Sequence, residues 1–249
     1  MAIRAVLFDL DGTLWSLGGM ASNPDFDWSG ITAIQAADLQ PHFERLGMRF
    51  DAHEFVTRFF AEINATLSPP TPDFSEPSWY PVLDRVLAAH GHRCERDDAS
   101  VILDTLNSVP FREFGISAFP DAAPALEALK NSGMKIGAVT NNPKPAHVLA
   151  GQARDLGLPD VFDTIVSSWE LGWRKPHHLP FQTALNNLGI AAHEAAHVGD
   201  SIQNDIEPAL KMGMTAVLRR NGGPTGNGAH HEVDSLEELP AVFGVNAGL

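Results

Sequence analysis

Short apolar runs rich in β-branched residues recur along the chain, and stretches with helical spacing separate most of them. Two such stretches are residues 125–129 before Gly133 and residues 181–188 before Gly189. This alternation is typical of βαβ units, so we predict an α/β fold with a Rossmann-like core in which helices cover both faces of a parallel sheet, giving three layers. The predicted strands are residues 3–8, 135–139, 164–167, 197–198 and 215–218, with a last short strand near Val233.

The interval from about Ser16 to Phe114 has a different pattern. Its apolar residues follow helical spacing, no convincing strand interrupts them, and breakers occur at Gly47, Gly91 and Pro110. We therefore predict an all-helical domain of about four helices, residues 16–114, inserted into a core formed by residues 1–15 and 115–249. The helical spacing is carried by Phe55, Phe59 and Ile63, by Val82, Val86 and Leu87, and by Ile102, Leu103 and Leu106.

The composition is that of a globular protein with a sizeable core, because 44% of the 249 residues are hydrophobic and 19% are charged. Thirty-one acidic residues against 17 basic ones give a formal net charge of −14. This excess of negative charge disfavours binding to nucleic acid or to an anionic membrane, so we expect neither as a partner. An anionic substrate would need positive charge placed locally.

The single cysteine, Cys94, excludes an intramolecular disulfide and fits a reducing compartment. The apolar stretch at the N-terminus is broken by Arg4 and ended by Asp9, which makes it too short for a secretory signal, and no run of 18 apolar residues occurs. We therefore expect a cytoplasmic protein. Metal ligands would be oxygens or histidines.

Polar residues follow several of the predicted strands at the point where each strand ends. The first strand runs into Asp9 and Asp11, whose spacing of two can place both carboxylates on one side, and Gly12 allows a sharp turn. Taken singly, each polar residue has an ordinary structural role, such as a turn, a helix cap or a solvated charge. In one parallel sheet, all of them would meet at the same edge, where ligands bind. The other such residues are Thr140, Asn141, Lys175, Asp200 and Asp205.

A cluster of Asp9, Asp11 and Asp200 would favour a bound cation, since two unit charges about 4 Å apart repel by roughly 4 kcal/mol at an effective dielectric near 20. Ligands that are all oxygens indicate Mg²⁺ rather than zinc. Lys175 and Thr140 would offer a positive charge and a hydroxyl to an anion beside the metal. This set of groups suits the transfer of a phosphoryl group.

Four groups of these residues, taken in chain order, closely resemble the motifs of the haloacid dehalogenase superfamily, in particular its phosphatases with a helical cap inserted after the first motif. The groups are Asp9 with Asp11, Thr140 with Asn141, Lys175, and Asp200 with Asp205. The resemblance covers residues 3–8 and the chain from Phe119 onward. It implies that Asp9 is the nucleophile that forms an aspartyl phosphate, and that Asp11 protonates the leaving oxygen and then activates water. Dehalogenases and phosphonate hydrolases of the superfamily usually lack an aspartate at the position of Asp11, so this residue favours phosphate monoesters.

The resemblance also implies the roles of the remaining site residues. Thr140 and Lys175 would hold the phosphoryl oxygens, and we add Asn141 to the predicted substrate-binding group. Mg²⁺ would be bound by Asp9, the main-chain carbonyl of Asp11, and Asp200. Asp205 would orient Lys175 or a metal-bound water from behind.

We therefore predict a Mg²⁺-dependent phosphatase acting on a small phosphorylated metabolite. A phosphomutase, which returns the phosphoryl group to a sugar, stays open as an alternative, and a phospho-accepting signalling domain or a catalytically silent binding protein fits less well. The segments 18–28 and 69–81 depart from the commonest pattern and could shape specificity. The histidine pairs at 177–178 and 230–231 are expected to be structural or solvated. Candidates for substrate contact from the cap side are Trp15, Trp28, Trp79, Arg58 and Arg85.

Overall fold

The computed structural model describes residues 2–17, 28–67, 73–226 and 228–245, and a six-stranded sheet forms its centre. The strand order is β5-β4-β1-β6-β7-β8, and every neighbouring pair is parallel. This arrangement confirms the predicted parallel sheet, although the strand predicted at 197–198 is longer. The strands are β1 (Ala5–Phe8), β4 (Lys135–Thr140), β5 (Thr164–Ser167), β6 (Ala195–Gly199), β7 (Thr215–Arg219) and β8 (His231–Val233).

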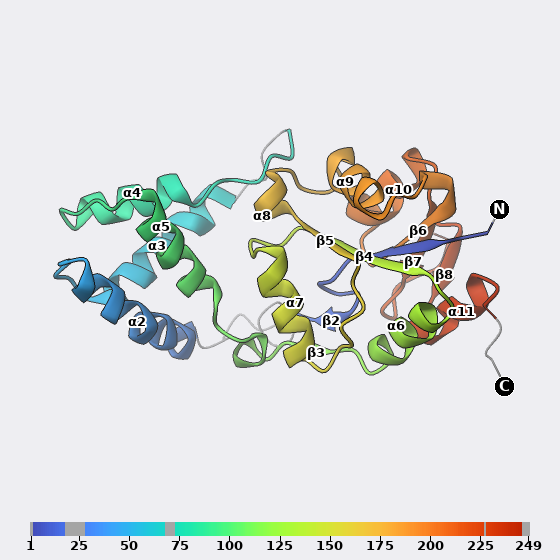
Figure 1. Ribbon diagram of the computed structural model, residues 1–249, viewed down its shortest axis with the longest axis horizontal. Coiled ribbons are helices and arrows are strands. Elements are labelled where there is room, and N and C mark those ends of the chain that lie inside the picture. The colour runs from blue at the N-terminus through green and yellow to red at the C-terminus, as the bar shows by residue number, and fades with distance from the viewer. Residues whose placement is uncertain (1, 18–27, 68–72, 227, 246–249) are drawn as a thin grey trace.

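Helices cover both faces of this sheet, as Figure 1 shows with α9 and α10 above it and α6, α7 and α11 below. Strand β1 is apolar on both sides: Val6 and Phe8 pack toward α6 and α7, whereas Ala5 and Leu7 pack toward α9 and α10. A strand buried on both faces explains why its sequence is continuously apolar rather than alternating. The helices are α6 (Ala122–Asn131), α7 (Ala146–Asp155), α8 (Ser168–Leu171), α9 (His178–Leu188), α10 (Glu207–Lys211) and α11 (Leu239–Val242).

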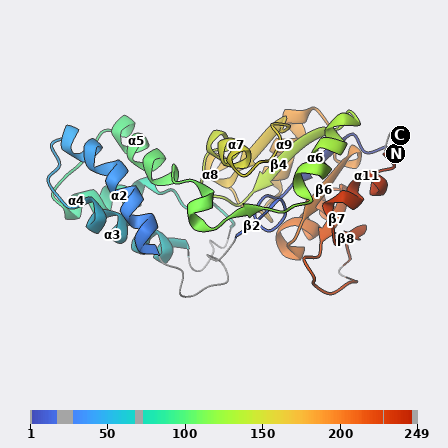
Figure 2. The same cartoon turned by 90° about the horizontal axis from the view of Figure 1, so that it is seen from below.

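Four further helices of the described chain lie between β1 and β4 and form a separate unit, seen to the left of the sheet in Figure 1 and again in Figure 2. They are α2 (Trp28–Arg45), α3 (Ala52–Leu67), α4 (Tyr80–Ala89) and α5 (Arg96–Asn107). Their buried side chains, among them Phe43, Phe55 and Leu87, form a hydrophobic cluster distinct from the two clusters on the sheet. The helical character predicted from the spacing is confirmed.

A small antiparallel strand pair stands where the chain passes between the sheet and the helical unit. Strand β2 (Trp15–Ser16) pairs with β3 (Ser117–Ala118), and Trp15 lies opposite Ala118. The outgoing and returning segments are therefore adjacent, close to the predicted junctions at residues 16 and 114. Short helical turns occupy Phe111–Phe114, Ala192–Glu194, Ile202–Ile206 and Leu236–Glu238.

Two details fall outside the sequence predictions. Helix α9 begins at His178, two residues after Pro176, and the His177 side chain accepts a hydrogen bond from the Leu179 amide at its start. Most of segment 18–28, together with residues 69–72 of the proline-rich stretch, lies outside the described residues. In the described part of the chain, none of the helices combines the length and the apolar character needed to cross a membrane.

Candidate active site

The site lies at the carboxyl ends of three adjacent strands. Asp9 directly follows β1, Thr140 is the last residue of β4, and Asp200 directly follows β6. Because β4, β1 and β6 are neighbours, their ends meet at one edge of the sheet. One carboxylate oxygen from each of Asp9, Asp200 and Asp205 lies within 4.8 Å of the others.

Lys175 is the positive centre of this cluster. Its Nζ donates to Asp9 Oδ1 and to Asp205 Oδ1, both at 2.6 Å, and the side chain is almost fully buried. The Asn141 side chain holds the Lys175 main chain, accepting from its N–H at 2.6 Å and donating to its carbonyl at 2.9 Å. These two bonds fix the orientation of the Asn141 side chain, and the substrate-binding role given to Asn141 stays a prediction.

Burial dominates the ionisation of the acidic groups. It raises the pKa of Asp9 to about 8, with the charge of Asp205 adding to the effect and Lys175 opposing it. Asp200 is the exposed member of the cluster, and its partial burial, followed by the negative charge of Asp205, raises its pKa. Burial also disfavours the charged form of Asp205, but Lys175 and His197 together hold the pKa of Asp205 well below its usual range.

The cluster places three carboxylates, those of Asp9, Asp200 and Asp205, around the single positive charge of Lys175, and the donor atoms are all oxygens. Both properties fit a divalent cation such as Mg²⁺. Asp205 is less available as a ligand, because its Oδ1 accepts from Lys175 and contacts His197 Nε2 at 3.0 Å while its Oδ2 accepts from the Ser201 amide at 3.1 Å. This geometry is consistent with the predicted role of Asp205 in orienting Lys175.

The carboxylate of Asp11 is bound on both oxygens. Trp15 Nε1 donates to Oδ1 at 2.7 Å, and Asn142 Nδ2 donates to Oδ2 at 2.9 Å. Trp15, one of the candidates for substrate contact from the cap side, is instead completely buried in the core of the sheet domain. Neither partner of Asp11 was predicted. The turn at Gly12 was the sequence feature that could have indicated Trp15 as a partner, because it folds the chain back so that residue 15 lies beside residue 11.

Thr140 offers the site a donor without a partner in the described part of the chain, and Gly12 allows its loop to approach Asp200 closely. The hydroxyl of Thr140 is buried and makes no hydrogen bond within the described residues, so it is free to bind an incoming anion. Gly12 has φ +83°, and a Cβ there would stand 2.3 Å from Asp200 Oδ2. Only glycine therefore allows the turn to approach the Asp200 carboxylate this closely.

Three other candidates contact residues outside this cluster. Trp79 is buried in the helical unit against Trp169, while Arg58 and Arg85 are exposed and pair with Glu62. The four paired histidines belong to no metal-binding group of the described residues, whereas the buried His197, which the sequence analysis missed, supports Asp205.

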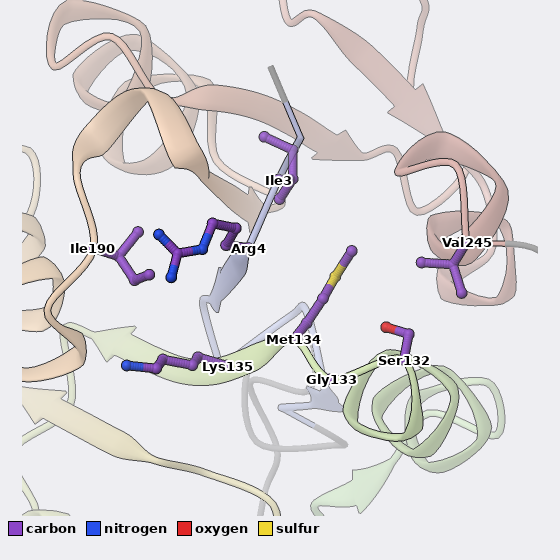
Figure 3. A pocket seen from close by; sticks show the side chains of 8 residues that line it. All are labelled: Ile3, Arg4, Ser132, Gly133, Met134, Lys135, Ile190 and Val245. Atoms are coloured by element: carbon purple, nitrogen blue, oxygen red, sulfur yellow. The ribbon is translucent and has the colours of Figure 1, made fainter.

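The pocket drawn in Figure 3 is also remote from the acidic cluster. It is lined by Arg4 and Lys135, among others, at the amino ends of β1 and β4, and so lies at the opposite edge of the sheet. None of the predicted site residues lines it.

Comparison with known proteins agrees with this architecture. A ribulose-1,5-bisphosphate 5-phosphatase of Halopiger xanaduensis is 31% identical over 94% of this chain and 97% of its own length. A phosphoglycolate phosphatase of Rhodospirillum rubrum is 36% identical over 88% of this chain and 80% of its own. The crystal structure of a 2-haloacid dehalogenase from Pseudomonas syringae is 28% identical, with a TM-score of 0.63 over 97% of this chain and 98% of that one.

The family model for haloacid dehalogenase-like hydrolases matches residues 3–213, which include the whole acidic cluster. This match spans most of the chain, both the sheet domain up to α10 and the helical unit. The chain therefore belongs to the haloacid dehalogenase-like hydrolase family.

Proposed function

We propose that this protein is a Mg²⁺-dependent phosphatase that hydrolyses the phosphate monoester of a small metabolite through an aspartyl phosphate on Asp9. The observation that carries the proposal is the second carboxylate, that of Asp11. Two hydrogen bonds hold this carboxylate in place in the loop after β1. A group there can protonate an alkoxide leaving group, which a phosphate ester needs. The curated relatives reported above are named phosphatases, which supports the same assignment.

In the first step, a carboxylate oxygen of Asp9 bonds to phosphorus while the ester P–O bond breaks. The Asp11 carboxylic acid gives its proton to the departing oxygen, so that an alcohol leaves. In the second step, the Asp11 carboxylate takes a proton from water as that water attacks the phosphorus. The bond between phosphorus and Asp9 then breaks, and inorganic phosphate is released.

The phosphoryl oxygens would be bound by the Lys175 ammonium and the Thr140 hydroxyl. Lys175 is charged in this setting, because Asp205 and Asp9 outweigh its burial and hold its pKa above the usual value. A fixed cation and a buried donor stabilise negative charge more strongly in a site that excludes water than in solution. Both groups are therefore suited to bind the phosphoryl group in the transition state of its transfer.

Asp9, the main-chain carbonyl of Asp11, and Asp200 would hold Mg²⁺. When bound, the metal would neutralise charge on the phosphoryl oxygens and favour the ionised form of Asp9. The gathering of three carboxylates around one ammonium group, that of Lys175, is the property of this structure that supports the assignment.

The helical unit, residues 16–114, is proposed to be the cap that selects the metabolite. The two relatives act, by their names, on ribulose 1,5-bisphosphate and phosphoglycolate, which are small anions. The net charge of −14 opposes nucleic acid as a substrate, and the lone Cys94 agrees with a cytoplasmic location.

The test is a screen for released inorganic phosphate over ribulose 1,5-bisphosphate, glyceraldehyde 3-phosphate, phosphoglycolate and sugar monophosphates. We expect at least one to be hydrolysed with Mg²⁺ present and none after exhaustive EDTA treatment. Activity that survives EDTA would overturn the metal assignment. Conversion of one sugar phosphate into its isomer without phosphate release would identify a phosphomutase instead.

A further inference from the structure

The Asp11 carboxylate is held from two sides by nitrogen donors that belong to different parts of the fold. Trp15 Nε1 lies 2.7 Å from Oδ1, and Asn142 Nδ2 lies 2.9 Å from Oδ2. A hydrogen bond to an ionised carboxylate is stronger and shorter than one between neutral groups. Two such bonds fix the plane of the carboxylate as well as its position.

The indole of Trp15 is itself held rigidly. The side chain is fully buried, and its ring meets the Phe111 ring edge-on with centroids 5.5 Å apart. Its main-chain carbonyl accepts from the Gly12 amide at 2.8 Å, and the residue pairs with Ala118 on β3. Trp15 therefore has no freedom to follow Asp11 if the carboxylate turns away.

Asn142 is supported equally well from the β4 side. Its Oδ1 accepts from the Lys144 amide at 3.2 Å, and its main-chain carbonyl accepts from Ser167 Oγ at 2.9 Å. These contacts leave the side-chain NH₂ directed at Asp11. The carboxylate thus sits between two donors whose own positions are set by the core.

We propose that Trp15 is a positioning residue for the acid/base step, in which its indole N–H holds Asp11 in the orientation needed to pass a proton to the leaving oxygen. This inference rests on the proposed function, because it assigns Trp15 to the proton transfer made by Asp11. Within the described residues Trp15 makes no hydrogen bond to Asp9 or Asp200, and its indole bonds the side chain of Asp11 rather than the main-chain carbonyl proposed to hold the metal. Its main effect is therefore expected on steps that need the Asp11 carboxyl group. A misplacement of about 1 Å at a reacting group can lower a rate about 100-fold.

The experiment compares Trp15→Phe, which keeps an aromatic ring in the core and removes the N–H donor, with Trp79→Phe. Trp79 is the matched control, since it is also a buried indole but its N–H makes no hydrogen bond within the described residues. Phosphoenzyme formation is measured in single-turnover reactions with two substrates, the best alkyl phosphate of the screen and p-nitrophenyl phosphate. The aryl leaving group hardly needs protonation, which separates the acid role from a general loss of structure.

We expect Trp15→Phe to slow phosphoenzyme formation from the alkyl phosphate by about tenfold to 100-fold, and from the aryl phosphate by less than about threefold. Trp79→Phe should leave both rates within about threefold of the wild type, as befits a residue outside the acid/base step. Equal slowing of both substrates by Trp15→Phe, or no slowing of either, would overturn the inference.

A second variant covers the case in which Trp15→Phe does not fold. Replacement of Trp15 by 3-benzothienylalanine keeps the bicyclic shape and puts sulfur in place of the N–H, and the same split between substrates is expected. If the wild type forms no phosphoenzyme with either substrate, the proposed function fails. If the wild type does so and both Trp15 variants match Trp79→Phe, the inference alone fails.

Discussion

Gly12 shows how a single residue determines the geometry between two catalytic segments. The sequence pattern Asp-x-Asp-Gly predicts a sharp turn, and the structure adds that the turn faces Asp200. A methyl group at position 12 would stand 2.3 Å from Asp200 Oδ2, a separation that real Cβ atoms do not show. The glycine is needed for this close approach in addition to its positive φ.

We predict that Gly12→Ala lowers activity at least about tenfold and raises the Mg²⁺ concentration needed for half-maximal activity, because Asp200 must move. Gly133→Ala is the matched control, with φ +86° and nothing within 4 Å of the added Cβ. Strain alone should lower its free energy of unfolding by about 1–3 kcal/mol and leave the Mg²⁺ dependence unchanged. Magnesium titrations of activity and urea unfolding of both variants test this, and an identical Mg²⁺ dependence in the two would contradict it.

The sequence predicts which residues gather at the site better than it predicts the hydrogen-bond partners that position them. Asp9, Thr140 and Asp200 could be assigned because the ends of neighbouring parallel strands share one edge. The partners of Asp11 could not, since the contact with Asn142 spans 131 positions and depends on the sheet order. The buried bond between His197 and Asp205 likewise follows from how the segment after β6 turns back on its strand.

At the scale of elements, the end of α5 is tied to the loop after β4 by Lys144. Its Nζ donates at 2.5 Å to the carbonyl of Asn107, the last residue of α5. A cation is favourable at a helix C-terminus, where the carbonyl groups lack partners within the helix. Burial nevertheless lowers the pKa of Lys144 from 10.5 to about 8, with Asp11 opposing the shift.

This shift predicts a pH-dependent stability. Between pH 8 and 10.5 the unfolded chain keeps a proton on Lys144 that the folded chain has released, so stability rises with pH across this window. Relative to Lys144→Met, the free energy of unfolding of the wild type should increase by up to about 3 kcal/mol from the bottom to the top of the window. Urea unfolding of both proteins at several pH values measures the difference, and parallel curves would show that Lys144 titrates normally.

Helical spacing predicted the elements of the helical unit well, because each of α3, α4 and α5 buries one apolar face in a shared cluster. The spacing did not indicate where α9 starts, and a local contact explains its boundary. A proline is favoured in the first turn of a helix, but here Pro176 precedes the helix and the His177 side chain caps it.

At the scale of the whole molecule, the hydrophobic clusters separate the helical unit from the sheet domain. The two are joined through β2 and β3, whose residues Ser16 and Ser117 lie opposite each other. A short linker from residue 17 to residue 110 could therefore replace the helices and leave Phe111 in the core cluster that contains Val6 and Phe8 of β1. The boundaries at residues 16 and 114 stay predictions.

We predict that a variant with a short Gly-Ser linker in place of residues 18–109, which keeps Phe111 beside Trp15, retains hydrolysis of p-nitrophenyl phosphate but loses most discrimination among metabolites. The reason is that the acidic cluster and Lys175 belong to the sheet domain, whereas contacts to a leaving group would come from the cap. Thermal unfolding first establishes that the variant folds, and kcat/KM over the substrate panel is then compared with the full chain. An unchanged ranking of metabolites would place specificity in the loops of the sheet domain.

The most direct test of the account asks where the phosphoryl group goes during turnover. A reaction with the best substrate is stopped in acid within milliseconds, the acyl phosphate is reduced with borohydride, and the digested protein is analysed by mass spectrometry. Homoserine at position 9, formed only with substrate and absent from Asp9→Asn, is the predicted result. Phosphate release by an Asp9→Asn variant, or a phosphoryl group found on another residue, would contradict the assignment of Asp9 as the nucleophile.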